Sequence, residues 1–340
     1  MHWRSIFAGA LTLVLAIQSY ISADNTTFVG PTLRGVVASP ISGEAAYSVL
    51  GEIGTRNFRG NGTIAFQVGN NNYFKISTDW LTQKLRYHSV KNSHIWVHQE
   101  AYGAAYAYNF NCGILSTIDL EGYFARAHNK NYRDIVEFTP AFGVDPSFTT
   151  TIERSISGAS YYGFSGGVTL EPLHCTTVSV ALNWDHIDYR TKNRSLDKKQ
   201  GFGGTVCIHQ QVFDNVGLDL KGSWRRPFDD YQAALNWYVC GYCPSDRASI
   251  GVFGGYTHTR YGVPDVGNVG IQVGYFFGGC NSCYNPCEYD PCCEPCNTFD
   301  LVAWASRPAV YIPVVLATQD VLTSVVTDPI PVIEGESGNN

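Results

Sequence analysis

Apolar and polar residues alternate with a period of two over most of the stretch 44–277. In one segment the apolar positions are Tyr102, Ala104, Tyr106 and Tyr108, and small or polar residues lie between them. This period is that of a β-strand whose two faces meet different environments. The alternation therefore predicts an all-β protein built from many strands.

About twelve segments show this alternation, and polar or glycine-containing links separate them. We expect strands near residues 45–56, 61–69, 72–87, 98–110, 113–126, 158–171, 175–190, 202–213, 215–225, 230–239, 247–259 and 267–277. Most of these segments are long enough to cross a membrane as a tilted strand, which takes about 9–11 residues.

The two faces of the predicted strands differ in a way that separates a membrane barrel from a soluble β-sandwich. The polar face is rich in Gly, Ser, Thr and Asn with single charges, and the apolar face tends to end in Trp, Tyr or Phe. A transmembrane β-barrel has lipid outside, aromatic girdles at the interfaces and a polar interior. We predict an antiparallel transmembrane β-barrel of about twelve strands, with a secreted sandwich as the alternative.

The lengths of the links also favour a barrel. Every second link is very short, as at 70–71, 111–112 and Asp214, with a longer exception around 240–243, while the other links reach their maximum at 127–157. Outer-membrane barrels have short periplasmic turns and longer external loops. We therefore expect the short links on the periplasmic side and the link 127–157 on the external side.

The first 23 residues have the pattern of a secretory signal peptide, which we assign to 1–23. Arg4 precedes an apolar run over 6–17, and Ile21-Ser22-Ala23 fits a cleavage site of small residues. Residues 24–43 carry only weak strand signals, so we expect an N-terminal periplasmic segment there, ahead of the barrel.

Composition narrows the classes of function. Charged residues make up 15% of the chain, against about 25% in a typical soluble domain. The net charge of −6 provides no basic surface for nucleic acid, and the 14% aromatic content argues against disorder. The low charge agrees with strands that turn one face toward outer-membrane lipid.

The last predicted strand alternates apolar residues and ends in an aromatic one, with Val269, Ile271, Val273, Tyr275 and Phe277 on one face. Val273, Tyr275 and Phe277 resemble the terminal-strand signal of the Gram-negative outer-membrane β-barrel superfamily. The resemblance covers about 44–277. It implies insertion by the barrel-assembly machinery, an outer-membrane location and, most often, passive diffusion of small solutes. The chain departs from the porin pattern because it continues to residue 340.

Two shorter stretches resemble narrower groups of barrels. The segment 285–296 is similar to the cysteine-rich segments of chlamydial-type major outer-membrane proteins. Residues 73–76 (YFKI) together with 80–85 (WLTQKL) resemble uncharacterised barrels of intracellular Legionella- or Coxiella-type bacteria. Both resemblances imply the same class of Gram-negative envelope protein.

The eleven cysteines are unevenly distributed. Cys207 lies within a predicted strand, and the other ten lie in periplasmic links or in the cysteine-rich segment 278–297. In an exported chain we favour disulfides over zinc, because the C-x₂-C pairs are closer together than in a zinc ribbon. The disulfide candidates are Cys112, Cys175, Cys240, Cys243, Cys280, Cys283, Cys287, Cys292, Cys293 and Cys296. Such bonds would fix the tail to the rim, form an isolated knot, or link the barrel to further copies or other envelope proteins.

Charged residues on the predicted polar face are candidates for lining the lumen. They are Lys75, Asp79, Asp119, Glu121, Asp185, Asp219, Lys221 and Arg225. Charges inside a pore select solutes through their local fields. Their mixed signs indicate a filled or weakly selective lumen, and mutual pairing within a polar interior is the simpler interpretation. We expect no cofactor and no metal.

The tail 298–340 contains an apolar cluster at 309–316, which is too short to span a membrane as a helix and has a central proline. The tail would plug the lumen, pack under the barrel or extend loosely into the periplasm, and no residue separates these alternatives.

The overall prediction is a porin-like or structural role in the envelope. A surface adhesin is the main alternative, with 127–157 as its exposed surface. An outer-membrane hydrolase is less favoured, because no motif selects a nucleophile. Asp185 and His186 are adjacent in one strand and therefore face opposite ways, so they cannot form a dyad. We expect no enzyme.

Overall fold

The computed structural model of the chain describes residues 26–86, 94–110, 114–129, 133–138, 148–173, 176–189, 198–213, 215–238, 247–260, 265–277, 299–313 and 317–327. The predicted signal peptide 1–23 and the cysteine-rich segment 278–297 lie outside these residues, so both assignments stay predictions.

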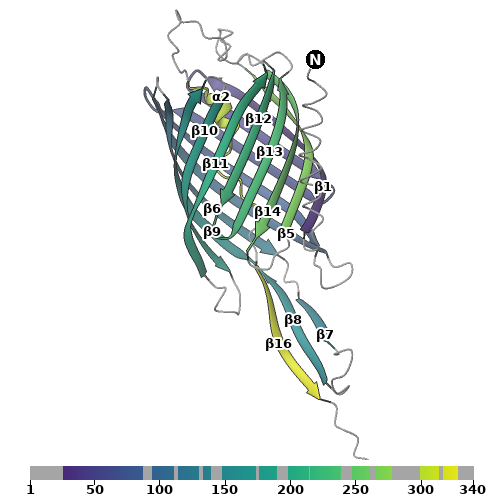
Figure 1. Ribbon diagram of the computed structural model, residues 1–340. Helices are drawn as coiled ribbons and strands as arrows, with labels where there is room; N and C mark the ends of the chain where they lie inside the picture. The colour runs from purple at the N-terminus through teal and green to yellow at the C-terminus, as the bar shows by residue number, and fades with distance from the viewer. Residues whose placement is uncertain are drawn as a thin grey trace, which may run out of the picture.

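Thirteen of the described strands form a closed barrel (Figure 1). They are β1 (Thr26–Ser42), β2 (Ala45–Gly54), β3 (Asn57–Gln67), β4 (Asn72–Arg86), β5 (His94–Asn109), β6 (Leu115–Asn129), β9 (Ala159–Leu173), β10 (Thr176–Tyr189), β11 (Lys198–Phe213), β12 (Val216–Trp224), β13 (Phe228–Tyr238), β14 (Arg247–Thr259) and β15 (Asp265–Phe276). The prediction of an all-β barrel is confirmed, and twelve of these strands match the twelve predicted ranges.

The thirteenth strand, β1, corrects the prediction. It lies in the stretch 24–43, which we expected to precede the barrel, and it pairs antiparallel with β2 and parallel with β15. An odd number of strands that alternate in direction leaves the first and last strands running the same way, so the closing pair is parallel. The alternation in β1 is weak because Pro31 and Pro40 lie beside shifts in register, and Gly30 has a φ of 88°.

The two ends of the barrel differ in their connections. We call the end at Ser42 and Phe276 the turn end, and the opposite end, at Gly54 and Thr259, the loop end. The links β3–β4, β9–β10 and β11–β12 at the turn end are short, while the longest connection, from β6 to β9, leaves from the loop end. This arrangement agrees with the predicted parity of short and long links.

A second, smaller sheet continues beyond the loop end (Figure 1). It consists of β7 (Arg133–Phe138), β8 (Phe148–Ser157) and β16 (Ala317–Thr327), in the order β16-β8-β7. The predicted external link 127–157 therefore contains a β-hairpin, and a strand from the C-terminal tail pairs with it.

The barrel wall is apolar outside and polar inside. In β3, Phe58 is 57% exposed on the outer face while its neighbour Arg59 is 4% exposed on the inner face. Outer aromatic residues lie near the turn end (Tyr47, Tyr106, Tyr108, Trp237, Tyr275, Phe277) and near the loop end (Phe58, Trp96, Tyr162, Phe202, Trp224, Tyr231). Between them lie aliphatic side chains such as Leu182, Leu220, Val252 and Ile271, and also the aromatic side chains of Trp80, Tyr102 and Phe124.

The described part of the chain contains one short helix, α2 (Leu301–Ala305), and no helix in that part is suited to crossing a membrane. The helix begins after Asp300, whose carboxylate accepts a hydrogen bond from the Ala303 N–H at 2.8 Å. Such a cap satisfies a backbone donor that the first turn leaves free. The helix lies inside the barrel toward the turn end (Figure 1).

Candidate functional site

The first described part of the tail, 299–313, lies inside the lumen against the inner faces of β1 to β5. Phe299 stacks on Tyr73 with ring centroids 3.8 Å apart. The helix packs its apolar face on small inner residues close to the turn end, namely Ala38, Ala46 and Ala65. Val310 and Ile312 are each 2% exposed. The tail is therefore packed as tightly as a protein core along this wall.

Side chains of the wall bind the main chain of the tail in the part nearer the turn end. The Ser48 hydroxyl donates to the Ala305 carbonyl at 2.6 Å, and the Lys75 ammonium donates to the Arg307 carbonyl at 2.7 Å. Two residues further along the tail, the Ala309 N–H donates to the Ser77 hydroxyl at 2.8 Å. These bonds satisfy backbone groups that would otherwise be buried without partners.

The same mode of binding continues toward the loop end. The Asn61 amide donates to the Val310 carbonyl at 3.3 Å, and Arg59 donates to the Ile312 carbonyl at 3.1 Å. The Gln99 amide donates to the Pro313 carbonyl at 3.0 Å. The hydrogen bonds of these wall residues thus go to main-chain atoms of the tail, while its apolar side chains pack in the core clusters.

Gly103 of β5 leaves the space in which the tail lies. A Cβ added at this glycine would lie 2.8 Å from the Val310 Cβ and 3.1 Å from the Ala309 carbonyl carbon. Main-chain atoms cannot move away as easily as the end of a flexible side chain. Any larger residue at position 103 would therefore push the tail off the wall.

One side chain of the tail, Tyr311, enters a group of four charged wall residues. Its hydroxyl accepts from Arg34 at 2.8 Å and donates to Glu52 at 2.9 Å. The Arg59 guanidinium lies 3.3 Å from the centroid of the Tyr311 ring and binds both carboxylate oxygens of Asp79, at 2.8 and 2.7 Å. We call these five residues the Tyr311 cluster.

The charges of the Tyr311 cluster are balanced. Arg34 lies 3.5 Å from Glu52, and the side chains of Glu52 and Asp79 are each 1% exposed. Buried charges are tolerated when they are paired and hydrogen-bonded, and Arg is suited to such pairs because its planar fork matches a carboxylate. The four charged residues therefore form a charge-balanced binding site for the Tyr311 side chain.

A second buried network lies on the opposite wall. Asp185 of β10 is 0% exposed and accepts hydrogen bonds from Tyr123 and Tyr161, each at 2.6 Å. Arg225 donates to Tyr161 at 3.0 Å and to the Asn183 amide oxygen at 2.9 Å. Tyr123 and Tyr161 also belong to the buried apolar cluster that contains Val310 and Ile312 of the tail. The network joins β6, β9 and β10 to the residue that follows β12, and so places its rings against the tail.

The wall formed by β11 to β13 is more open than the wall that binds the tail. The side chain of Asp219 is 44% exposed and that of Lys221 is 31% exposed. Asp219 pairs with His209 at 2.7 Å, and Lys221 pairs with Asp230 at 3.4 Å. The tail therefore covers one side of the lumen and leaves charged groups of the other side accessible.

The structure places the eight predicted lumen charges on the inner side of the wall and divides them among several groups. Lys75 and Asp79 bind the tail or the Tyr311 cluster, and Asp185 joins Arg225. Asp219 and Lys221 belong to the open wall. Asp119 and Glu121 face inward from β6, where Asp119 accepts from Thr117 at 3.2 Å. No single ring of charge is formed by these eight residues.

Four residues of the Tyr311 cluster were not among the sequence candidates, namely Arg34, Glu52, Arg59 and Tyr311. Glu52 falls on the polar face of the predicted strand 45–56, so the period of two could have identified it as a lumen residue. Arg59 begins the run Arg-Gly-Asn-Gly, which is typical of a turn. The structure instead places this run inside β3, where pairing with β2 and β4 overrides the local preference.

The terminal-strand residues lie on the outer face, as Val273 is 46%, Tyr275 38% and Phe277 44% exposed. The ten disulfide candidates lie outside the described residues, so their pairing stays a prediction. The strands that flank Cys112 and Cys175 in the chain end at the turn end. Cys207 lies in β11 and is the one free cysteine in the described ranges.

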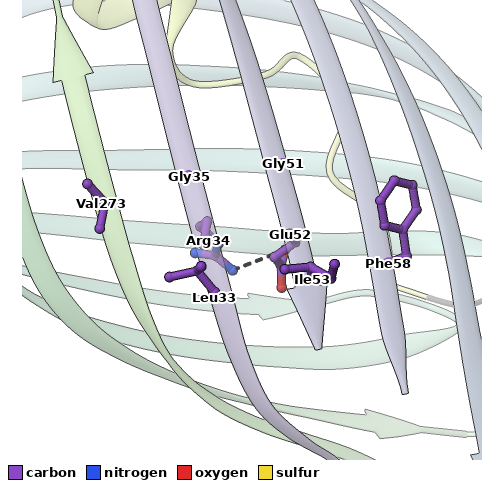
Figure 2. Close-up of a pocket in the computed structure, with 8 residues that line it drawn as sticks. All are labelled: Leu33, Arg34, Gly35, Gly51, Glu52, Ile53, Phe58 and Val273. Carbon is purple, nitrogen blue, oxygen red and sulfur yellow. Dashed lines mark ion pairs between the residues drawn. The ribbon is translucent and has the colours of Figure 1, made fainter. Parts of the chain in front are cut away.

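A shallow depression of about 320 Å³ lies on the outer wall over β1, β2 and β3 (Figure 2). It exists because Gly35 and Gly51 face outward side by side, while Leu33, Ile53 and Phe58 form its apolar rim. Figure 2 also shows the Arg34–Glu52 ion pair of the Tyr311 cluster beside it. The depression is thus separate from the lumen.

The adjacent residues Asp185 and His186 lie on opposite faces of β10, as the period of the strand predicts. Asp185 is buried inside the barrel, whereas the adjacent His186 stacks on Tyr162, with ring centroids 4.7 Å apart. Within the described ranges, no group of three or more His, Cys, Asp or Glu residues is placed to hold a metal ion.

The chain was also compared with known proteins. No protein-family model matches it, and no curated protein shows significant sequence similarity to it.

Proposed function

We propose that the protein is an outer-membrane β-barrel of a Gram-negative bacterium, with a porin-like or structural role, in which the C-terminal tail restricts the lumen. The observation that carries this proposal is the inverted wall, apolar outside and polar inside, closed around a bound segment of the same chain. The turn end faces the periplasm and the loop end faces outward, because membrane barrels have short periplasmic turns and longer external loops.

The outer surface supports the membrane location. Leu182 is 72% and Phe202 81% exposed, and neither would be stable against water over so wide an apolar face. Aromatic residues occur near both ends of the outer face, where membrane barrels place their girdles, although Trp80, Tyr102 and Phe124 lie between the two ends. The distribution is the reverse of that in a soluble domain, where large apolar residues lie inside.

The bound tail supports a restricted passage. The wall from β1 to β5 is covered by residues 299–313, and the remaining accessible side chains include Asp219 and Lys221, which have opposite charges. A passage along β11 to β13 is therefore narrow and weakly selective. A free pore of the full barrel width requires the tail to leave.

Planar-bilayer conductance tests this proposal. Full-length protein should give small or infrequent current steps, and a chain lacking residues 299–340 should give larger and more stable ones. A matched control deletes only 328–340 and leaves the lumen segment in place. Equal conductance of the full-length chain and the 299–340 deletion would contradict the restricted lumen, and absence of the protein from the outer-membrane fraction would contradict the location.

The cysteine-rich segment adds a structural role that can be tested separately. Cross-links on the periplasmic side would stiffen the envelope by linking barrels to one another or to other proteins. Non-reducing gels should then show oligomers that collapse with a thiol reductant. A monomer under both conditions would contradict the cross-linking.

The sheet β16-β8-β7 supports a second candidate, a surface adhesin. It projects beyond the loop end, away from the wall that meets lipid (Figure 1). Cells should then bind to surfaces coated with the protein, and deletion of 133–157 should abolish binding while the barrel still folds. Unchanged binding after this deletion would exclude the sheet as the adhesive part.

A further inference from the structure

The tail starts its path at the turn end of the barrel. β15 ends at Phe276, and the next described segment begins with Phe299, which stacks on Tyr73 at the start of β4. Tyr73 follows the β3–β4 link, which lies at the turn end. The tail therefore enters the lumen at the end where the last barrel strand finishes.

The contacts of the tail then advance in one direction. Along β4 the partners are Tyr73 for Phe299, Lys75 for the Arg307 carbonyl and Ser77 for the Ala309 N–H. Increasing residue number in β4 leads toward the loop end, so the tail runs parallel to this strand. It does not form a hairpin and return.

The last lumen contacts lie close to the loop end. The Pro313 carbonyl accepts from Gln99, which lies near the start of β5 at that end. β16 begins at Ala317, which pairs with Ser157, directly before the start of β9 at the loop end. Four residue steps between Pro313 and Ala317 span at most about 14 Å. The tail must therefore leave the barrel at the loop end.

Beyond the barrel the tail continues outward. The pairing of β16 with β8 runs from Ala317 opposite Ser157 to Thr327 opposite Phe148, so β16 leads away from the barrel rim (Figure 1). The hydrogen bonds of this ladder fix an emerged segment to the hairpin β7–β8.

The geometry points to a conduit role: the barrel passes its own C-terminal chain through the lumen and displays it, paired with the β7–β8 hairpin, on the outer side. This inference rests on the proposed function, which sets the orientation in the membrane. The wall suits a conduit because its hydrogen bonds to the tail, apart from those of Tyr311, go to main-chain carbonyls and N–H groups, which every peptide carries. The side chains of Phe299, Val310, Tyr311 and Ile312 then hold this particular segment in the lumen. The cysteine-rich segment then stays on the periplasmic side while the strand that follows it is external.

Epitope tags at three positions test the inference in a Gram-negative host. One tag follows Asn340, one is inserted after Gly43 in the β1–β2 link at the turn end, and one is inserted after Arg226 in the β12–β13 link at the loop end. Antibody binding is measured on intact cells and again after permeabilisation. We expect the tags at 340 and 226 to be labelled on intact cells and the tag at 43 to be labelled only after permeabilisation.

The outcomes separate the inference from the proposed function. A tag at 340 that behaves like the tag at 43, while the tag at 226 is external, overturns the conduit and leaves the membrane barrel intact. Tags at 43 and 226 that do not differ overturn the orientation in the membrane and the conduit with it. Each tagged chain is first checked for outer-membrane fractionation and heat-modifiable migration, which report a folded barrel.

A pair of glycine variants tests the path of the tail by comparing two chains that carry the same tags. Gly103→Val places a side chain where the tail lies, whereas Gly122→Val, on the adjacent strand, points into open space on the outer face. We expect Gly103→Val to lower external labelling of the tag at 340 at least several-fold, with labelling at 226 unchanged. Gly122→Val should change neither. Equal labelling of the tag at 340 in both variants overturns the path along β5.

Discussion

The guanidinium of Arg59 lies against the ring of Tyr311, 3.3 Å from its centroid, and so joins the barrel wall to the tail across 252 positions of sequence. A cation over an aromatic ring contributes about 0.5–2 kcal/mol, and hydrogen bonds to charged groups about 1.5–3 kcal/mol each. Tyr311 makes its nearest contact of the first kind with Arg59, while Arg34 and Lys221 lie 5.6 and 5.9 Å from the same ring centroid. It makes two contacts of the second kind, with Arg34 and Glu52. It is therefore the strongest single attachment of the tail.

Substitution of Tyr311 should release the tail. Tyr311→Ala removes the ring and both hydroxyl bonds, so bilayer conductance should rise toward that of the 299–340 deletion. Tyr311→Phe keeps the ring over Arg59 and should give an intermediate conductance. Tyr102→Ala, which removes an outward tyrosine of β5, should leave conductance unchanged. If Tyr311→Ala conducts like the full-length chain while the 299–340 deletion conducts more, the main-chain bonds hold the tail without Tyr311.

The Arg59–Asp79 pair should show strong coupling. Either Arg59→Met or Asp79→Leu leaves an unpaired charge inside the barrel, at a cost of about 3–5 kcal/mol in the free energy of unfolding. The double variant removes both charges and should be less destabilised than either single variant. Urea unfolding in lipid vesicles, followed by tryptophan fluorescence, measures all three. Additive losses would mean that the two side chains do not depend on each other.

Two neighbouring tyrosines provide a matched test of the Asp185 network. Tyr161→Phe removes a 2.6 Å hydrogen bond to a carboxylate that is 0% exposed, so the free energy of unfolding should fall by about 1–3 kcal/mol. Tyr162→Phe alters the adjacent residue on the outer face and should have little effect. The same urea experiment measures the free energy of unfolding of both variants. An equal decrease in the two would contradict a specific role of Tyr161 in the Asp185 network.

The outer face gives a direct test of lipid contact. Leu182 lies at the centre of β10 and is 72% exposed. An arginine on the lipid face of a barrel costs about 2–4 kcal/mol at the membrane midplane. Leu182→Arg should therefore reduce the folded fraction in vesicles far more than Leu182→Ala. Similar folding of the two variants would indicate that position 182 faces water.

The twelve strands of the prediction were readable because each turns one face outward and one face inward, which imposes a period of two on the sequence. β1 was not readable because two prolines and a glycine break that period, and the strand is held by pairing with β2 and β15. The strands β7, β8 and β16 were not predicted either. They lie outside the barrel, where the two faces of a strand do not meet lipid and lumen, so their sequences do not alternate in the same way.

The lumen charges were predicted from the same period, but their partners were not. The sequence contains no signal that brings Tyr311 to Arg59, since the contact depends on the curvature of the closed wall and on the direction of the tail. Of the alternatives left open for the tail, the structure places 299–313 in the lumen. The run Ala309-Val310-Tyr311-Ile312 fits there because Gly103 leaves room for its main chain, and because Val310 and Ile312 pack in a buried apolar cluster that includes Tyr123 and Tyr161.

The odd number of strands has a consequence for biogenesis. In a barrel with an even number of strands, the first strand begins and the last strand ends on the same side of the membrane, the side from which the chain arrives. Here Thr26 lies at the loop end and Phe276 at the turn end. In the proposed orientation, the assembly machinery must carry the beginning of β1 to the outer surface before the seam with β15 can form. The seam is the one parallel ladder in the wall, and because parallel pairing is slightly weaker per residue, it is the place where the wall is held least strongly for its length.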